Sequence, residues 1–528
     1  MKKILYIFIM AALPMLNAMS QTMQDRIDLN MAVQKIGATL MAVKGMYIDT
    51  TNTAQLADEA IKGILAQLDP HSSYSTADET KRLTEPLNSN FEGIGVQFNV
   101  LNDTLVVIQP VSKGPSEKAG ILAGDRIILV NDTAIAGVKM SREEMMKRLR
   151  GPKGSVVMLG VKRRDVQETL YFRIVRDKIP LHSLDAAYMI RPGIGLIRLE
   201  NFAASTKDEL HDAIKKLKKK GMKSLILDLQ MNGGGYLEAA YAVASEFLQK
   251  DDLVVYTDGR VVPKQRHTAS GDGSFKEGQL VILVDEYTAS AAEIVSGAVQ
   301  DHDRGTIIGR RTFGKGLVQR PISLPDGSMV RLTVSHYYTP SGRCIQKPYK
   351  KGQKKEYEED VLNRYNNGEL MHLDSIHFAD SLKCYTLKEH RVVYGGGGIM
   401  PDIFVPLDTT IYTKHYRDLG RKNVIINTYM NWYDNHRKEL TGKYKDFDKF
   451  RNDFEVPQEL VDSIISKGRE AKVAPADDAE LQQTLVRLKL QLKALVARDL
   501  WEMNEYYVIM NEENDIVRRA LQLLTPNP

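Results

Sequence analysis

Cysteine is scarce in this sequence, which has Cys344 and Cys384 and no others in 528 residues. Two cysteines cannot staple a chain of this length, so a disulfide-rich scaffold is excluded, while a single bridge between the two stays open. No pair of Cys or His residues has the spacing of zinc ligands. We therefore expect no metal site and no cofactor.

The sequence also lacks an apolar run long enough to cross a bilayer. The run at the N-terminus, Ile4 to Leu13, is about ten residues, half of what a spanning helix needs. It follows Lys2 and Lys3 and precedes the small-x-small stretch Ala18-Met19-Ser20. These features predict a signal peptide over residues 1–20, with an uncleaved anchor as the alternative. We expect an exported protein, periplasmic in a Gram-negative bacterium, and leave an association with the envelope membrane open.

Strong charge of either sign is missing too. The formal net charge is +5, of which Lys2 and Lys3 supply two. No dense basic run with interleaved aromatic residues appears, so we expect no nucleic-acid partner. The stretch Gly309–Gly316, GRRTFGKG, resembles a phosphate-binding loop, but Gly316 stands where that loop needs a Ser or Thr hydroxyl for magnesium. We therefore expect no nucleotide site, and Lys315 is either a solvated loop lysine or has another role.

The composition is that of a soluble globular protein, with 43% apolar and 26% charged residues. The chain is long enough for several domains. Four parts are expected after the signal peptide: 21–88, mostly helical; 89–177, compact and β-rich; 178–410, alternating β and α; and 411–528, helical and highly charged. The fold class that follows is a mixed α/β core with an inserted β-rich domain and helical N- and C-terminal regions.

The alternating part holds the residues best suited to catalysis. Its buried strands are predicted at Ser224–Leu229, Leu280–Val284 and Thr306–Gly309. Strands alternating with helices indicate a mainly parallel sheet, whose ligands bind beyond the C-terminal ends of the strands. The glycine run Asn232–Gly235 and the stretch Asp285–Ser290 both follow such ends.

Ser290 stands at a predicted junction between a strand and a helix. A helix N-terminus offers free N–H donors, so an oxyanion formed beside Ser290 could bind the N–H of Ala291 and one from the glycine run. The plain alternative is structural. Ser290-Ala-Ala-Glu293 is a capping box, in which the serine only caps the helix.

A serine nucleophile needs a base. His302 lies at the far end of the predicted helix, roughly three turns from Ser290. Lys315 follows the next strand, and its amine can serve if burial lowers its pKa by about three units. Gln319 lies a short way further on, where its amide oxygen could accept a proton from the lysine.

Three stretches carry a resemblance to a known family: Val284–Ile294, Gln300-Asp301 and Thr312–Gln319. They resemble the C-terminal processing peptidases, also called tail-specific proteases, which are exported Ser/Lys endopeptidases. The resemblance extends over most of the chain, including Leu68–Ser72 and Tyr338–Gly342. It implies three catalytic residues: the nucleophile Ser290, the general base Lys315 and the orienting residue Gln319.

The resemblance also implies backbone donors for an oxyanion hole, at Gly234, Gly235 and Ala291. It assigns a supporting position to Asp301. One departure concerns the glycine loop, which in the family usually reads D-L-R-x-N-P-G-G. Here Gln230 replaces the arginine and Gly233 the proline. The donors remain, but the loop is expected to be less rigid.

Residues 89–177 resemble a PDZ domain. The loop Gly93-Ile94-Gly95, which leads into a strand at Val96, can aim backbone N–H groups at a terminal carboxylate. An ordinary glycine turn is the alternative. The resemblance implies that the partners are protein or peptide substrates with free, apolar C-termini.

Two functions stay in competition: a serine endopeptidase that recognises protein C-termini through its PDZ unit, and a non-catalytic peptide-binding scaffold on the same fold. A decayed relative should have lost at least one of Ser290, Lys315 and Gln319, so their joint presence favours the protease. A Ser–His hydrolase using His302 would need a helix break that the sequence does not contain. The terminal helices are candidates for a homo-oligomer contact.

Overall fold

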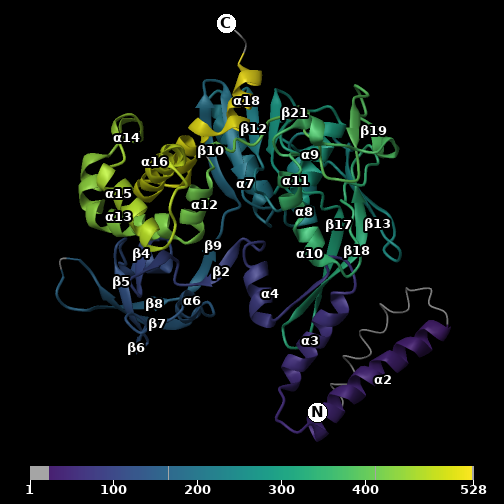
Figure 1. Ribbon diagram of the computed structural model, residues 1–528, viewed down its shortest axis with the longest axis horizontal. Helices are drawn as coiled ribbons and strands as arrows, with labels where there is room; N and C mark the ends of the chain where they lie inside the picture. Colours follow the sequence, from purple (N-terminus) through teal and green to yellow (C-terminus); the bar gives the residue numbers. More distant parts are fainter. Residues whose placement is uncertain (1–22, 165, 411, 526–528) are drawn as a thin grey trace.

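The computed structural model describes residues 23–164, 166–410 and 412–525. The predicted signal peptide lies outside them. These residues form a helix-covered sheet, a second sheet beside it, a β-rich unit and a helical bundle (Figure 1). None of the described helices is both long and apolar enough to cross a membrane.

A six-stranded sheet forms the centre of the core. Its order is β10-β11-β12-β15-β16-β21; β10 is antiparallel, and the other five run parallel. The bounds are β10 Leu184–Arg191, β11 Ile194–Leu199, β12 Ser224–Asp228, β15 Leu280–Val284, β16 Thr306–Gly309 and β21 Ile403–Phe404. The central strands are buried on both faces, which is why β15 is apolar throughout and β12 is apolar except at its two end residues. The predicted α/β core is confirmed.

Helices cover both faces of this sheet. One face carries α7 Thr206–Lys219, α8 Leu237–Ala244 and α9 Ala291–Asp301. The other is covered by α18, Asp515–Leu524, which comes from the far C-terminal end of the chain (Figure 1). Its buried side chains are Ile516, Val517, Ala520 and Leu524. They pack against strand residues that include Ile226 and Leu283.

A second sheet stands beside the core. Its strands are β1 Ser73–Ser75, β13 Leu253–Asp258, β14 Gln265–Thr268, β17 Leu317–Ser323 and β18 Met329–Tyr338. Strand β18 pairs with β17 on one side and with β1 and β13 on the other. Strand β17 continues through Pro321. Because β17 pairs only with β18, the proline lies on an edge strand, where its missing N–H costs no ladder bond.

The β-rich unit is a sheet of order β3-β4-β5-β7-β8 with two helices. Its elements are β3 Val96–Leu101, β4 Thr104–Pro110, α5 Pro115–Ala119, β5 Arg126–Val130, β6 Thr133–Ala134, α6 Arg142–Leu149, β7 Val156–Lys162 and β8 Leu170–Val175. A two-stranded ribbon of β2 Asn90–Gly93 and β9 Asp177–Pro180 joins it to the core. Strand β3 is an edge of this sheet.

Of the three N-terminal helices, α2 Met23–Met46 and α3 Thr53–Leu65 extend away from the body of the molecule (Figure 1). The third is α4, Ala77–Thr84. Helix α4 lies against α6 of the β-rich unit, where Lys147 and Asp78 form an ion pair at 3.1 Å. The segment between α3 and α4 adds β1 to the second sheet, so the N-terminal region reaches the core.

After β18 the chain passes through short elements before β21: α10 Lys354–Glu358, α11 Asp360–Asn366, β19 Lys383–Tyr385 and β20 Val392–Tyr394. The C-terminal region is a bundle followed by two helices that return to the core. Its helices are α12 Lys414–Arg421, α13 Val424–Lys443, α14 Phe447–Asp453, α15 Gln458–Glu470, α16 Asp478–Leu500, α17 Met503–Met510 and α18.

A row of leucines on α16 packs inside the bundle, where Leu488, Leu492 and Leu495 are buried. The same cluster includes Leu101 and Val106, because the bundle covers the outer face of the β-rich sheet. These leucines therefore form a packing face within the chain.

Candidate active site

Ser290 occupies the turn between β15 and α9, in a backbone conformation that few non-glycine residues adopt. Its φ is 59° and its ψ −118°. Such a conformation costs on the order of 1–3 kcal/mol and is typical of functional sites. Gly234 lies directly against it: a Cβ on Gly234 would come within 2.7 Å of the Ser290 Cβ and 2.8 Å of the Ala291 nitrogen. Only glycine fits this close approach.

The buried carboxylate of Glu293 connects Ser290 to the lysine loop. One oxygen, Oε2, accepts the N–H of Ser290 at 2.8 Å and that of Lys315 at 2.9 Å. The other, Oε1, accepts the Gly314 N–H at 2.8 Å and the Thr312 hydroxyl at 2.5 Å. Four donors around one carboxylate satisfy an ionised group fully. The predicted capping box is thus part of a larger clamp that fixes two loops together.

A second clamp comes from β18. The hydroxyl of Tyr337, a fully buried residue, lies 3.1 Å from the Ser290 carbonyl oxygen and also donates to the carbonyl of Lys315. Burial raises the pKa of Tyr337 well above its ordinary value, so it stays a donor. Glu293 and Tyr337 therefore hold the backbones of Ser290 and Lys315 side by side. Glu293 accepts hydrogen bonds from their N–H groups, and Tyr337 donates to their carbonyl oxygens.

Lys315 has the lowered pKa that a general base needs. Burial lowers the pKa of its amine to about 8, with help from the Arg331 guanidinium. The carboxylates of Glu293 and Asp69 oppose the shift, which explains why it is smaller than the three units expected from the sequence. About half of the molecules carry a neutral amine at pH 8, and about one in ten at pH 7.

The glycine loop brings two N–H groups to the side of Ser290. Gly234 N–H donates to Asn232 Oδ1 at 2.8 Å, so it is engaged within the loop. No hydrogen bond from the N–H of Gly235 or of Ala291 is found within the described part of the chain. The N–H groups of Gly235 and Ala291 are therefore the available donors for an oxyanion. Gly234 has no side chain, which lets the loop lie close to Ser290.

Gln319 and Asp301 are the two remaining predicted side chains. Within the described residues, neither of them forms a hydrogen bond with the Lys315 amine. The amide nitrogen of Gln319 donates to Leu317 O at 3.2 Å and to Thr333 Oγ1 at 3.4 Å; across the described residues it makes no bond to Lys315. Asp301 ends α9, where Arg343 pairs with it in full burial and the Ser341 N–H donates to it at 2.8 Å.

His302 is in the wrong place for a base. It directly follows α9, and its Nε2 lies 2.7 Å from the Leu253 carbonyl oxygen. Ser290 caps the other end of this helix, 12 residues earlier, so the two are about 18 Å apart along the axis. The geometry does not support the Ser–His alternative.

Sequence reasoning missed the groups that the N-terminal region brings to Lys315. Asp69 accepts the hydroxyls of Thr333, at 2.7 Å, and of Ser72, at 2.5 Å, and so links Gln319 to the N-terminal segment. Burial and the charge of Lys315 lower the pKa of His71 to about 3, so it is neutral. The signal was available in the stretch Leu68–Ser72, which interrupts a helical pattern, but only the pairing of β1 with β18 places it here.

Replacing Glu293 by glutamine is expected to destabilise the protein by about 3 kcal/mol, because the amide nitrogen would face N–H donors in full burial. Urea unfolding followed by circular dichroism measures the change. The exposed Glu277→Gln in the same domain is the control and should stay within about 0.5 kcal/mol of the parent. Equal stability of the two variants would contradict the clamp.

The predicted carboxylate loop of the β-rich unit lies at the start of its edge strand. Gly93 pairs with Asp177 in the ribbon, the Ile94 carbonyl accepts the Ser116 hydroxyl at 2.7 Å, and Gly95 has a φ of +72°. This φ lies in the region that favours glycine, and a Cβ there would come within 2.9 Å of the end of the Ile179 side chain. Val96 begins β3, the edge that can accept a further strand.

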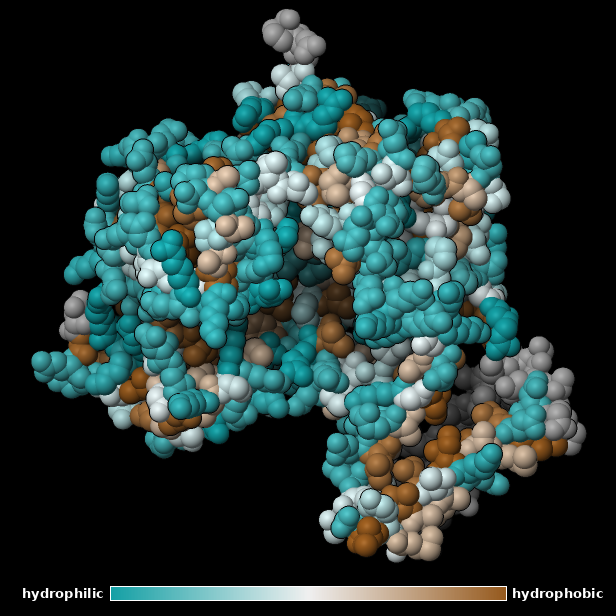
Figure 2. Space-filling view, in the orientation of Figure 1, coloured by the Kyte–Doolittle hydropathy of each residue, from teal (hydrophilic) through white to brown (hydrophobic). Residues whose placement is uncertain are grey.

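A cavity of about 960 Å³ adjoins the site and separates the core from the C-terminal helices. On the core side it is lined by Met231, Tyr287 and Phe313, next to the glycine loop, Ser290 and Lys315. The opposite wall includes Tyr412 and Arg487. Figure 2 shows the surface hollowed between the bundle and the core, with apolar side chains inside the hollow.

Comparison with known proteins fits this arrangement. Residues 193–355 match the model of peptidase family S41, and residues 93–174 match the PDZ domain. The Carboxy-terminal-processing protease of Bartonella bacilliformis is 35% identical over 344 residues, covering 64% of this chain and 78% of that protein. The chain belongs to the carboxy-terminal processing proteases.

A second relative of the protease gives a similar match. Carboxy-terminal processing protease CtpB of Bacillus subtilis is 31% identical over 337 residues, 63% of this chain and 70% of that one. A solved photosystem II D1 C-terminal processing protease is 26% identical, with 70% of this chain and 86% of that one covered and a TM-score of 0.33. Residues 415–502 match a family of unknown function, DUF8443, which covers most of the bundle.

Proposed function

We propose that the protease is a serine endopeptidase in which Ser290 is the nucleophile and Lys315 the general base. The observation that carries the proposal is the shared Glu293 carboxylate, which binds the N–H of both residues. A strained serine, a lysine with a lowered pKa and unoccupied N–H donors at the same place are the parts that acyl transfer requires.

The reaction follows from these groups. The neutral amine of Lys315 takes the proton of the Ser290 hydroxyl as its oxygen attacks the carbonyl carbon of the scissile peptide. The N–H groups of Gly235 and Ala291 stabilise the oxyanion. The C–N bond then breaks, the Lys315 ammonium returns the proton to the leaving amine, and water hydrolyses the acyl-enzyme by the same proton transfers in reverse.

The surroundings of Lys315 tune this base. Burial and Arg331 make the amine easier to deprotonate, while Asp69 limits the shift. We assign Gln319 to the same network, because it reaches Asp69 through Thr333. Asp301 supports the site indirectly, through its buried ion pair with Arg343 at the end of α9.

In this proposal the β-rich unit binds the C-terminus of the substrate. A peptide adds as a strand to β3, with its terminal carboxylate on the N–H groups of the Gly93-Ile94-Gly95 loop. The last side chain of the peptide is apolar, because Val96 and Phe98 on β3 pack against the apolar cluster that contains Met145 and Leu149 of α6.

Amidation of the C-terminus of a substrate peptide is expected to weaken its binding by about tenfold or more, since hydrogen bonds to a charged group are lost. Fluorescence anisotropy with the full-length Ser290→Ala protein measures the two affinities without cleavage. A peptide with a free carboxylate but a C-terminal aspartate is the control for the apolar position. Equal affinity for acid and amide would rule out tail reading.

We further propose that a second copy of the chain covers the N-terminal helices. Helix α2 exposes several large apolar side chains, among them Met31, Val33 and Met41, each more than half exposed. Multi-angle light scattering should give a dimer mass or larger, and Met31→Glu with Met41→Glu should give a monomer. A monomeric parent protein would exclude this contact.

Export remains part of the proposal, supported by the pattern of residues 1–20. N-terminal sequencing of the protein from the periplasmic fraction is expected to start close to Gln21, and an intact Met1 there would contradict cleavage. The non-catalytic scaffold has no specific observation in its favour, because the clamp and the lowered pKa of Lys315 serve no purpose in peptide binding alone.

A further inference from the structure

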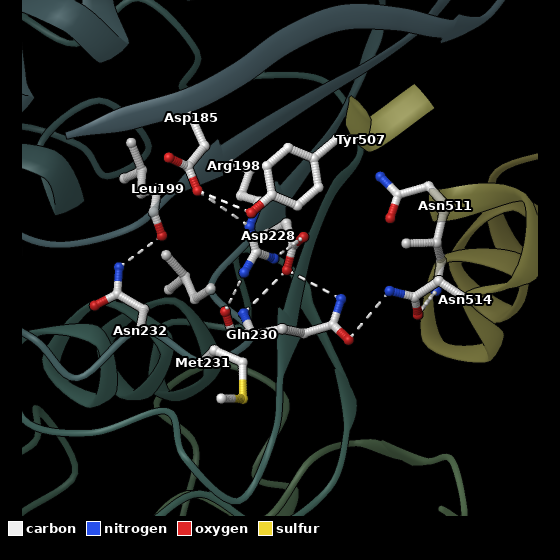
Figure 3. Close-up of polar contacts among 12 residues, drawn as sticks. Asp185, Arg198, Leu199, Asp228, Gln230, Met231, Asn232, Tyr507, Asn511 and Asn514 are labelled. Atoms are coloured by element: carbon white, nitrogen blue, oxygen red, sulfur yellow. Dashed lines mark hydrogen bonds and ion pairs between the residues drawn. The ribbon is translucent and has the colours of Figure 1, made fainter. Parts of the chain in front are cut away.

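The departure from the usual glycine-loop sequence is accommodated by residues from elsewhere. Gln230 stands where the family usually has arginine, and a guanidinium reaches the loop from the neighbouring strand instead (Figure 3). Arg198 on β11 donates to Asp228 Oδ2 at 2.6 Å and to the Gln230 carbonyl oxygen at 2.9 Å. The pKa of Arg198 is raised despite its burial, since Asp228 and Asp185 surround it. Arg198 therefore fixes the start of the loop.

Side chains of the C-terminal helices α17 and α18 contact Arg198, Asp185 and Gln230. The Tyr507 ring of α17 lies 4.7 Å from the Arg198 guanidinium, within the range of a cation–π contact. Its hydroxyl donates to Asp185 at 3.0 Å. At the start of α18, Asn514 donates to the Gln230 side-chain oxygen at 3.3 Å, and the other end of that amide donates to Asp228 at 3.0 Å (Figure 3).

The loop transmits its position to Ser290 through a short chain of bonds. After Gln230, the Met231 N–H donates to both oxygens of Asp285 at 3.0 Å. The Asn232 side chain donates to the Leu199 carbonyl at 2.8 Å, and the Asn232 carbonyl accepts the Ala289 N–H at 2.9 Å. Gly234 then lies so close to Ser290 that a Cβ on it would come within 2.7 Å of the Ser290 Cβ. Because these bonds follow one another closely along the loop, a displacement of the Gln230 backbone should also displace the N–H groups proposed as oxyanion donors.

We infer that Tyr507 and Asn514 are positioning residues for the glycine loop, so that the C-terminal helices complete the active site. This inference rests on the proposed serine-protease function for its catalytic consequence. It assigns the two side chains to the orientation of the Gly235 N–H through Arg198 and Gln230. Substrate binding at the PDZ unit does not use these contacts.

The test compares two double variants of the full-length protein. Tyr507→Phe with Asn514→Ala removes the Tyr507 hydroxyl, which bonds to Asp185, and the Asn514 side chain, which bonds to Gln230 and also caps α18; the ring is kept. Tyr416→Phe with Asn52→Ala is the control, because the Tyr416 hydroxyl donates to Gln491 within the bundle and Asn52 caps α3 as Asn514 caps α18. The two proteins should have similar midpoints of thermal unfolding.

Amide hydrogen exchange of residues 231–236 gives a readout that needs no turnover. Exchange is expected to be about tenfold faster in the positioning variant than in the control, because local opening becomes easier. In peptide hydrolysis, kcat should fall about tenfold with KM within about twofold, since only transition-state stabilisation is weakened. Affinity for a C-terminal peptide should stay unchanged.

Unchanged exchange, faster exchange with unchanged kcat, or equal losses in the two double variants would each overturn the inference. Failure of the proposed function appears differently: the parent protein would then cleave no peptide in a manner that depends on Ser290. In that case the exchange experiment still decides whether the C-terminal helices order the loop.

Discussion

Replacement of Ser290 by alanine is expected to lower peptide hydrolysis at least about 10⁴-fold, to background, while folding and peptide binding are retained. The mutation removes the attacking oxygen and nothing that the fold depends on, because the clamps at this residue use its backbone. Cleavage of a tailed substrate, followed by mass spectrometry, measures the loss.

Ser296→Ala is the matched control, since Ser296 is a buried serine on the same helix whose hydroxyl bonds to the Ala292 carbonyl at 2.9 Å. It should keep turnover within about threefold of the parent, because a single helix-internal hydroxyl contributes little. Near-parental cleavage by Ser290→Ala would reduce Ser290 to a helix cap.

Lys315→Arg is expected to be as inactive as Lys315→Ala. Arginine keeps the positive charge, but its guanidinium does not lose a proton in proteins and cannot act as a base. A lysine that bound substrate or stabilised the fold would tolerate arginine better. Lys350→Arg, at an exposed position nearby in the chain, should behave as the parent does.

The pH profile of the parent protein offers an independent check of this base. Because the amine acts in its neutral form and its pKa is about 8, kcat/KM should rise about tenfold between pH 7 and pH 9 and then level off. Loss of Arg331 should move the rise to higher pH, since its charge helps to lower that pKa.

A folded His302→Ala protein should keep its turnover. Inactivity of this variant, or turnover by Lys315→Arg, would revive the histidine mechanism.

The sequence predicts the core well because its strands bury both faces and leave a simple apolar signal. β15 and β16 have the bounds expected, and α9 begins directly after Ser290, at the predicted junction. The second sheet escaped prediction for the opposite reason. β1 is three residues long and β18 is only partly buried, so neither carries a strong pattern.

The sequence predicts those parts of the candidate site in which a single residue carries the chemistry. It does not predict the parts that depend on contacts between residues far apart in the chain. Ser290 and Lys315 stand out in the chain, but the use of Glu293 as a bridge between them depends on how two loops meet. Arg331 and Asp69, which act on Lys315 in opposite directions, come from β18 and from the N-terminal region. Their effect arises only when the second sheet forms.

The packing of α18 on the core sheet sets the order in which this protein can mature. The strands β11, β12, β15 and β16 are synthesised long before α18, which emerges after the whole bundle. Until then the core keeps one apolar face uncovered, with Ile226, Leu283 and their neighbours exposed. Newly made chains are therefore in need of chaperone protection late in synthesis.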